Sequence, residues 1–130
     1  MRLTDHAWIS HIDHVVLTVR DIDEAVEFYT RVLQVEVISF AQGRRALKFG
    51  NQKITLQYLG QEQRNNAAVG SGDICLIAVQ PLAAVIKHLQ AQSVSILEGP
   101  VEKSGAIGPM QSVYFNDPSG NLIEISDYGA

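Results

Sequence analysis

Four polar side chains lie in otherwise apolar segments of the sequence and are the strongest candidates for chemistry. They are His14, Gln57, Asp73 and Glu124. Glu124 interrupts the apolar stretch NLIEIS, where a carboxylate must be solvated, paired or bound to a cation. Because Cys75 is the single cysteine, a metal site in this chain would use imidazole, carboxylate or amide ligands.

Each of these side chains also has an ordinary structural interpretation. Glu124 could lie on a solvated sheet face, and His14 could be a packed histidine whose ring nitrogens are hydrogen-bonded. Gln57 could be a surface amide, since amides are uncommon metal ligands, and Asp73 could cap the turn that precedes it. The residue types alone leave both interpretations open.

Strand alternation predicts which side chains share a face. Along the first predicted strand, His14 lies with Val16 and Thr18. Glu124 lies with its strand neighbours at positions 122 and 126. His11 is three residues before His14, so the pair would point to opposite faces and would not chelate one ion together. The remaining histidines, His6 and His88, are expected at the surface.

The first half of the chain reads as strand, helix and three strands. Residues 12–19 are rich in β-branched residues, and a capping-box-like Asp21 with Glu24 opens an amphipathic helix of about three turns. Turn signals at Gln42-Gly43 and Gly50-Asn51 separate the strands that follow. These strands are expected at 35–40, 45–49 and 53–59.

A polar segment at 60–72 precedes a second copy of the same pattern. Pro81 opens a second predicted helix, and Asp117-Pro118-Ser119-Gly120 has the residues of a type I turn. Strands are expected at 73–79, 94–97, 111–115 and 121–126. Fifty-nine residues separate His14 from Asp73, and the strands after the two helices keep the same offset. The repetition predicts an α+β fold with two tandem βαβββ modules, in which the helices cover one sheet face.

Composition narrows the classes of function. The chain has 130 residues, of which 46% are hydrophobic and 18% are charged, which is typical of one globular domain. A net charge of -4 and scattered basic residues argue against a nucleic-acid partner. No apolar run resembles a signal peptide or a membrane span, so a cytoplasmic protein is expected.

Common catalytic motifs are absent from the sequence. It contains no nucleophile elbow, phosphate-binding loop or HExxH zinc motif, and nothing around Cys75 indicates a catalytic thiol. The Gly-rich segment 99–109 lacks the spacing of a phosphate-binding loop and is expected to form a loop between strands.

Both ends of the chain resemble a known family. Residues 12–33 (IDHVVLTVRDIDEAVEFYTRVL) and 115–126 (FNDPSGNLIEIS) resemble the opening and closing segments of the vicinal oxygen chelate superfamily. This superfamily contains glyoxalase I, bleomycin-resistance proteins and extradiol dioxygenases. With 70–77 (GSGDICLI), the chain is most similar to small glyoxalase-domain proteins. The resemblance implies a single domain over 1–130, in which modules 10–60 and 72–128, joined by a linker at 61–71, curl into a cup.

The resemblance also implies a divalent metal held by one residue from the first and last strand of each module. Carried over by position, these ligands are His14, Gln57, Asp73 and Glu124. Gln57 and Asp73 replace the family's more common Glu or His, which leaves an oxygen-rich set suited to Mn, Fe, Ni or Mg more than to Zn. An extradiol dioxygenase, which needs two His and one carboxylate around iron, is disfavoured.

The leading hypothesis is therefore a metal-dependent lyase or isomerase of the glyoxalase type. The metal would bind two oxygens of a small substrate and stabilise the enediolate formed when a carbon-bound proton leaves. Glu124 is the candidate ligand that also moves the proton. Arg45 or its neighbour Arg44 could recognise an anionic substrate, and Ser112 and Tyr114 should share a face of the cup.

Two other functions remain open at this point. The first is a metal-free protein that binds and sequesters a drug-like molecule, as bleomycin-resistance proteins do, although nine aromatic residues are a small supply for such a pocket. The second is thiol transfer to an electrophilic antibiotic, for which the expected second histidine is missing. By resemblance, the protein is expected to form a homodimer, and the modules could pair within one chain or across two.

Overall fold

The helices and strands follow one another along the chain in the predicted order. The computed structural model describes residues 8–129. The first half contains β1 (His14–Thr18), α1 (Ile22–Val32), β2 (Glu36–Phe40), β3 (Arg44–Phe49) and β4 (Gln52–Gln57). The second half contains β5 (Asp73–Ile77), α2 (Leu82–Ala91), β6 (Glu98–Gly105), β7 (Gly108–Asn116) and β8 (Leu122–Asp127).

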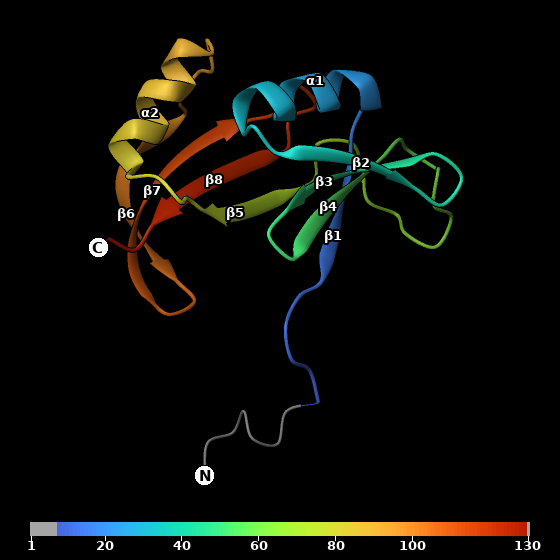
Figure 1. Ribbon diagram of the computed structural model, residues 1–130, viewed down its shortest axis with the longest axis horizontal. Helices are drawn as coiled ribbons and strands as arrows, with labels where there is room; N and C mark the ends of the chain where they lie inside the picture. Colours follow the sequence, from blue (N-terminus) through green and yellow to red (C-terminus); the bar gives the residue numbers. More distant parts are fainter. Residues whose placement is uncertain (1–7, 130) are drawn as a thin grey trace.

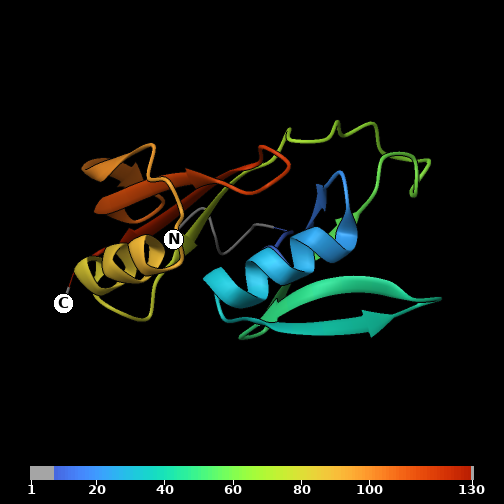
Figure 2. The ribbon, with the colours of Figure 1, turned by 90° about the horizontal axis from the view of Figure 1, so that it is seen from above.

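Each half forms its own four-stranded mixed sheet. The strand orders are β1-β4-β3-β2 and β5-β8-β7-β6, so the two sheets have the same topology. In both, the first and last strands of the half are parallel neighbours and the remaining pairs are antiparallel. The sheets lie side by side, and both helices are on the same side of the molecule (Figures 1 and 2). This confirms the predicted α+β fold of two βαβββ modules.

Helix α1 begins where the capping residues predicted. The Asp21 carboxylate accepts a hydrogen bond of 2.8 Å from the Glu24 backbone N–H, which satisfies one of the free donors of the first turn. The apolar side of the helix then packs on the first sheet, because its buried residues recur at helical spacing. These residues are Ala25, Phe28, Tyr29 and Val32, and they join Leu17, Leu47, Ile54 and Leu56 of the sheet in the core.

Most of the segment 99–109, which was expected to be a loop, instead belongs to the edge strand β6. It pairs antiparallel with β7, and the hairpin turn falls between Gly105 and Gly108. The predicted strand at 94–97 is wrong, since the strand begins only at Glu98. The register shifts between Glu98 and Val101, and this irregularity accommodates Pro100, which has no N–H for the ladder. The prediction at 99–109 was wrong because its glycine and proline content indicated a loop, whereas pairing with β7 makes it a strand.

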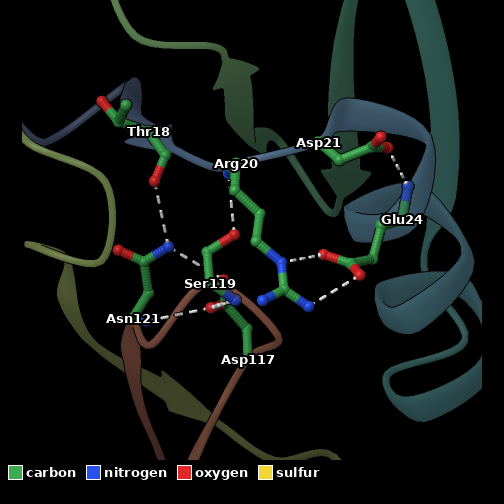
Figure 3. Close-up of polar contacts among 7 residues, drawn as sticks. All are labelled: Thr18, Arg20, Asp21, Glu24, Asp117, Ser119 and Asn121. Carbon is green, nitrogen blue, oxygen red and sulfur yellow. Dashed lines mark hydrogen bonds and ion pairs between the residues drawn. The ribbon is translucent and has the colours of Figure 1, made fainter.

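The two halves are joined by a buried polar cluster around the predicted turn at 117–120. Asp117 accepts hydrogen bonds from the Tyr29 hydroxyl at 2.7 Å and from the Asn121 side chain at 2.9 Å. Asn121 in turn donates to the Thr18 carbonyl, and Ser119 accepts from the Arg20 backbone (Figure 3). The closing segment of the chain therefore holds the end of β1 and the side of α1.

A second contact between the halves involves a histidine that was expected at the surface. His88 on α2 is half-buried, and its Nε2 lies 2.8 Å from the Val32 carbonyl at the end of α1. Nearby, the Arg31 guanidinium donates to the Gln92 carbonyl at 2.9 Å. His88 is therefore a structural link between the helices, a role that its position along the sequence could not reveal.

Between Gln57 and Asp73 the chain forms neither helix nor strand. The predicted linker lies within this segment, while the exact domain and module boundaries remain a prediction. Among the residues that the structure describes, no helix is both long and apolar enough to cross a membrane.

Candidate functional site

Apart from Arg45, the predicted site residues lie on the faces of the two sheets that are turned away from the helices. We call these face A, on β1–β4, and face B, on β5–β8. Strand alternation and register assign the side chains to them. Face A carries His14, Val16, Thr18, Glu36, Ile38, Phe40, Arg44, Ala46, Lys48, Lys53, Thr55 and Gln57. Face B carries Asp73, Cys75, Ile77, Ser112, Tyr114, Leu122, Glu124 and Ser126.

On face A, the register separates two of the predicted ligands. His14 is paired with Lys53, whereas Gln57 is paired with Thr18 at the other end of β1. The Gln57 amide is buried and already engaged, because its Nε2 donates to Thr18 Oγ1 at 2.8 Å and to Asn65 Oδ1 at 2.9 Å. Gln57 therefore holds the segment after β4 against the sheet.

Comparing the registers of the two sheets identifies the true counterpart of Glu124. Glu124 is paired with Cys75, which lies two residues after Asp73. The equivalent position in the first half is paired with Val16, two residues after His14, and it is Thr55. The sequence pointed to Gln57 because it is the polar residue near the end of the last strand of its half, and only the register identifies Thr55 as the equivalent position.

On face B, Glu124 lies in a network of small polar side chains. It is only 9% exposed, and its Oε2 accepts a hydrogen bond of 3.2 Å from the Ser126 hydroxyl. Ser126 is also 2.6 Å from the Ser112 hydroxyl and 3.2 Å from the Cys75 sulfur. Ser126 and Cys75 were not predicted as site residues, although alternation from Glu124 and Asp73 could have identified both.

The Tyr114 hydroxyl lies beside Glu124 from the neighbouring strand. Burial, followed by the hydrogen bond to Glu124 and the charge of its carboxylate, raises the pKa of Tyr114 to about 12. Tyr114 therefore keeps its proton at neutral pH. Burial and the charges of Glu124 and Asp73 also raise the pKa of the Cys75 thiol, against the opposing effect of Ser126. A protonated thiol is a poor nucleophile, which agrees with the absence of a catalytic cysteine motif.

The first residues of β1 and β5 are accessible. His14 and Asp73 are both exposed, and His14 Nδ1 lies 2.8 Å from the carboxylate of its neighbour Asp13. This contact leaves His14 Nε2 available to another partner. However, across residues 8–129 no group of three or more His, Cys, Asp or Glu side chains is placed to hold one metal ion. A single chain thus presents the candidate ligands on two separate faces.

The two adjacent arginines have different environments. Arg45 is paired with Leu56 and lies on the helix side of the sheet, where its Nη1 is 3.6 Å from Asp23 of α1. Arg44 is on face A, where its guanidinium is 6.0 Å from the centre of the Phe40 ring. Of the pair, only Arg44 shares a face with His14.

Ser112 and Tyr114 share face B with Glu124, as alternation predicted. The hollows found among the described residues lie elsewhere. A cavity of about 470 Å³ lies between α2 and the β6–β7 hairpin, and one of about 230 Å³ lies where α1 meets the turn at 117. No predicted site residue lines either of them. His6 lies outside the described residues.

The sequence model of the glyoxalase/bleomycin resistance protein/dioxygenase superfamily matches residues 11–125. The chain belongs to this superfamily. Two related proteins match it over 92% of its length. Glyoxalase domain-containing protein RDO1 of Mycosarcoma maydis is 45% identical, with 69% of that protein covered. Virulence protein STM3117 of Salmonella typhimurium is 46% identical, with 85% covered.

Solved structures of the superfamily have the same arrangement of strands and helices. The integron cassette protein VCH_CASS1, from the mobile metagenome of V. cholerae, is 49% identical to this chain. It superposes with a TM-score of 0.89 over 95% of this chain and 98% of its own. The resemblance read from the two ends of the sequence is therefore confirmed as superfamily membership.

Proposed function

We propose that this glyoxalase-superfamily protein is a divalent-metal-dependent lyase or isomerase that acts on a small substrate chelated through two oxygens. The observation that carries the proposal is the environment of Glu124. A carboxylate that is 9% exposed, on a face that no helix covers, is held by the Ser126 hydroxyl rather than by a basic side chain. Such a carboxylate keeps its charge available to a cation or a proton.

The donor chemistry supports a site of one imidazole and two carboxylates. His14, Asp73 and Glu124 would be the ligands, and the position equivalent to Glu124 in the first half is the uncharged Thr55. We leave Gln57 out of the set because its amide is buried and bonded to Thr18 and Asn65. An oxygen-rich set favours Mn, Fe, Ni or Mg over Zn.

In this proposal Glu124 transfers the substrate proton, and its neighbours hold the carboxylate in place. A bound divalent ion would supply Lewis-acid polarisation of two substrate oxygens. Glu124 would then take a proton from the adjacent substrate carbon and return it to a neighbouring position. Ser126 orients the carboxylate through its hydrogen bond to Oε2, and the protonated Tyr114 lies opposite it on the next strand.

The ligands of one chain are divided between face A and face B, so the proposal includes a second copy of the chain. In a homodimer, face A of one protomer would lie against face B of the other and bring His14 to Asp73 and Glu124. Exposed apolar residues support such a contact, since Ile77 on face B is 54% exposed and Val79 beyond β5 is 98% exposed.

One similar solved structure is that of an enzyme, which is compatible with catalysis. The lactoylglutathione lyase of Agrobacterium tumefaciens is 25% identical and superposes with a TM-score of 0.74 over 93% of this chain and 96% of its own. The alternative is a metal-free small-molecule binding protein, a role for which the exposed Ile77 on face B offers an apolar contact. The antibiotic binding protein TnmS3 from Streptomyces, 21% identical, shows only that the fold is compatible with it.

Metal content distinguishes the two functions. Purified protein, Glu124→Ala and His14→Ala should be incubated with Mn²⁺, Fe²⁺, Ni²⁺ and Zn²⁺, dialysed, and analysed for metal per chain. The proposal predicts near-stoichiometric metal in the wild type and loss in both variants. Glu102→Ala, which removes an exposed carboxylate from β6, serves as the control and should bind metal normally.

A wild-type protein that retains no metal would refute the proposal and favour the binding protein. Full metal and full turnover of 1,2-dicarbonyl or 2-hydroxyacid substrates in Glu124→Ala would exclude the assigned role of Glu124. Sedimentation of the wild type tests the dimer, and a monomer that binds stoichiometric metal would exclude a site shared between two chains.

A further inference from the structure

Two basic side chains converge on one aromatic ring on face A. The Lys53 ammonium lies 3.6 Å from the centre of the Phe40 ring, and the Arg44 guanidinium carbon lies 6.0 Å from it. Both distances are within the range of cation–π attraction. None of the three residues belongs to the Glu124 network on face B.

The contact between Lys53 and Phe40 crosses the sheet. Lys53 is paired with Lys48 on β3, whereas Phe40 is paired with Arg44 at the other end of the same strand. To meet, the two side chains must extend over the middle of face A. The middle of this face is formed by Ala46 on β3 and its partner Thr55 on β4, which are 0% and 3% exposed although no helix covers the face. The Lys53 ammonium is therefore positioned above the face and not at its edge.

The positive charge there is only partly balanced. Across the described part of the chain, no carboxylate lies within 4.0 Å of the Lys53 ammonium in an ion pair. The carboxylate nearest Arg44 is Glu62 at 4.0 Å, and Glu62 is hydrogen-bonded through both oxygens to Arg64. The Arg44 Nε atom is buried without a hydrogen-bond partner.

Face B provides an internal comparison. Its edge strand carries Lys103, whose ammonium lies near the Tyr114 ring at 5.6 Å and also near the Glu98 carboxylate at 3.8 Å. There, an aromatic contact and a carboxylate act on the same ammonium. On face A the aromatic ring is present, but among the described residues no carboxylate forms an ion pair with the Lys53 ammonium. An aromatic ring attracts a cation without neutralising its charge, so the ammonium can still bind an anion.

We propose that Lys53 and Arg44 bind a carboxylate group of the substrate on face A. The inference rests on the proposed function and narrows its substrate class to small molecules with a carboxylate besides the two chelating oxygens. Lys53 is paired with His14 on the adjacent strand, and its side chain extends from there over face A to Phe40, so the carboxylate site lies on the same face as the proposed metal ligand. Phe40 holds the Lys53 ammonium over this face through the cation–π contact.

Two probes of equal chain length isolate the effect of the carboxylate. 2-Oxoglutarate and 2-oxopentanoate share the 2-oxo acid group, but the second has a methyl group in place of the distal carboxylate. Calorimetric titration should show at least about tenfold tighter binding of 2-oxoglutarate, as expected for one charge-assisted contact. Lys53→Met should remove this preference, and Lys53→Arg should retain part of it. Lys87→Met, at an exposed position on α2, is the control and should keep the full preference.

A second measurement separates this inference from the metal proposal. In metal-free protein with ¹³C-methylated lysines, 2-oxoglutarate should shift the Lys53 methyl resonance, assigned by its absence in Lys53→Met, and 2-oxopentanoate should leave it in place. If metal binding fails while this shift and the affinity preference persist, only the proposed enzymatic function is lost. Equal affinity for the two probes, or an unchanged preference in Lys53→Met, would overturn the carboxylate site.

Discussion

The buried bond between Tyr29 and Asp117 should contribute measurably to the stability of the protein. The Tyr29 side chain is 0% exposed, and its hydroxyl donates a hydrogen bond of 2.7 Å to the carboxylate of Asp117. Asp117 is itself only 4% exposed. Tyr29→Phe keeps the ring and its contact with Phe28 while it removes this one donor. Asp117 Oδ2 would then retain only the hydrogen bond from the Asn121 amide.

The expected loss follows from the charge of the acceptor. A hydrogen bond to a charged group contributes about 1.5–3 kcal/mol, so we expect the free energy of unfolding to fall by about 2 kcal/mol. An unfolding entropy of about 2.1 cal/mol/K per residue converts this value to a Tm lower by about 7 °C for a chain of 130 residues. Urea and thermal denaturation followed by circular dichroism measure both quantities. Tyr58→Phe, at a residue that is 53% exposed, is the control and should change stability by less than about 0.5 kcal/mol.

The same bond predicts how stability depends on pH. Burial, followed by the charge of Asp117 and the hydrogen bond to it, raises the pKa of Tyr29 above its usual value. Above about pH 10 the unfolded tyrosine loses its proton while the folded one keeps it, so stability falls as the pH rises. Tyr29→Phe should lose this contribution to the slope and remain less stable at neutral pH. If the variant unfolds at the wild-type urea concentration at pH 7, the reasoning about this bond is refuted.

Three further outcomes are expected. Ultraviolet titration of tyrosinate should show a group with a pKa of about 12 that disappears in Tyr114→Phe. In Glu124→Gln the same group should titrate at lower pH, because the carboxylate charge is gone. An unchanged titration curve in both variants would contradict the contact between Tyr114 and Glu124. Gly99→Ala should destabilise the protein by more than about 2 kcal/mol in urea, because a Cβ would lie 2.4 Å from the Ser112 carbonyl at φ +115°. Gly108→Ala, also at positive φ but in open space, should cost less, and equal losses would mean that the close approach is not the cause. Asp21→Ala should lower stability by about 1 kcal/mol through loss of the helix cap, and thermal melts within 1 °C of the wild type would count against the cap.

Local residue patterns were sufficient to predict most of the secondary structure. Helix α1 was found from Asp21, Glu24 and an apolar stripe, since capping and burial act within a few residues along the chain. Strand alternation likewise placed Ser112 and Tyr114 on the face of Glu124, because side-chain direction follows from the pleat. The prediction failed at 99–109, where pairing with β7 overrides the glycine and proline content of β6.

The candidate site was predictable only in part. The sequence identified Glu124 as a carboxylate in an apolar strand, but the hydrogen bonds of Ser126 and the raised pKa of Tyr114 depend on which strands are neighbours. The role of Gln57 could not be predicted because Asn65, its partner, lies in a segment without regular structure.

By itself, the sequence determined the fold class, the repeat of two βαβββ halves and the family, because hydrophobic period, caps and turn residues are local properties that each module repeats. Only the tertiary structure decided register, and register assigned Thr55 as the counterpart of Glu124 and Lys53 as the neighbour of His14. It also decided which of the adjacent residues Arg44 and Arg45 lies on the helix side of the sheet. Hydrogen bonds between strands that are distant in sequence set these relations, and no short stretch of sequence contains them.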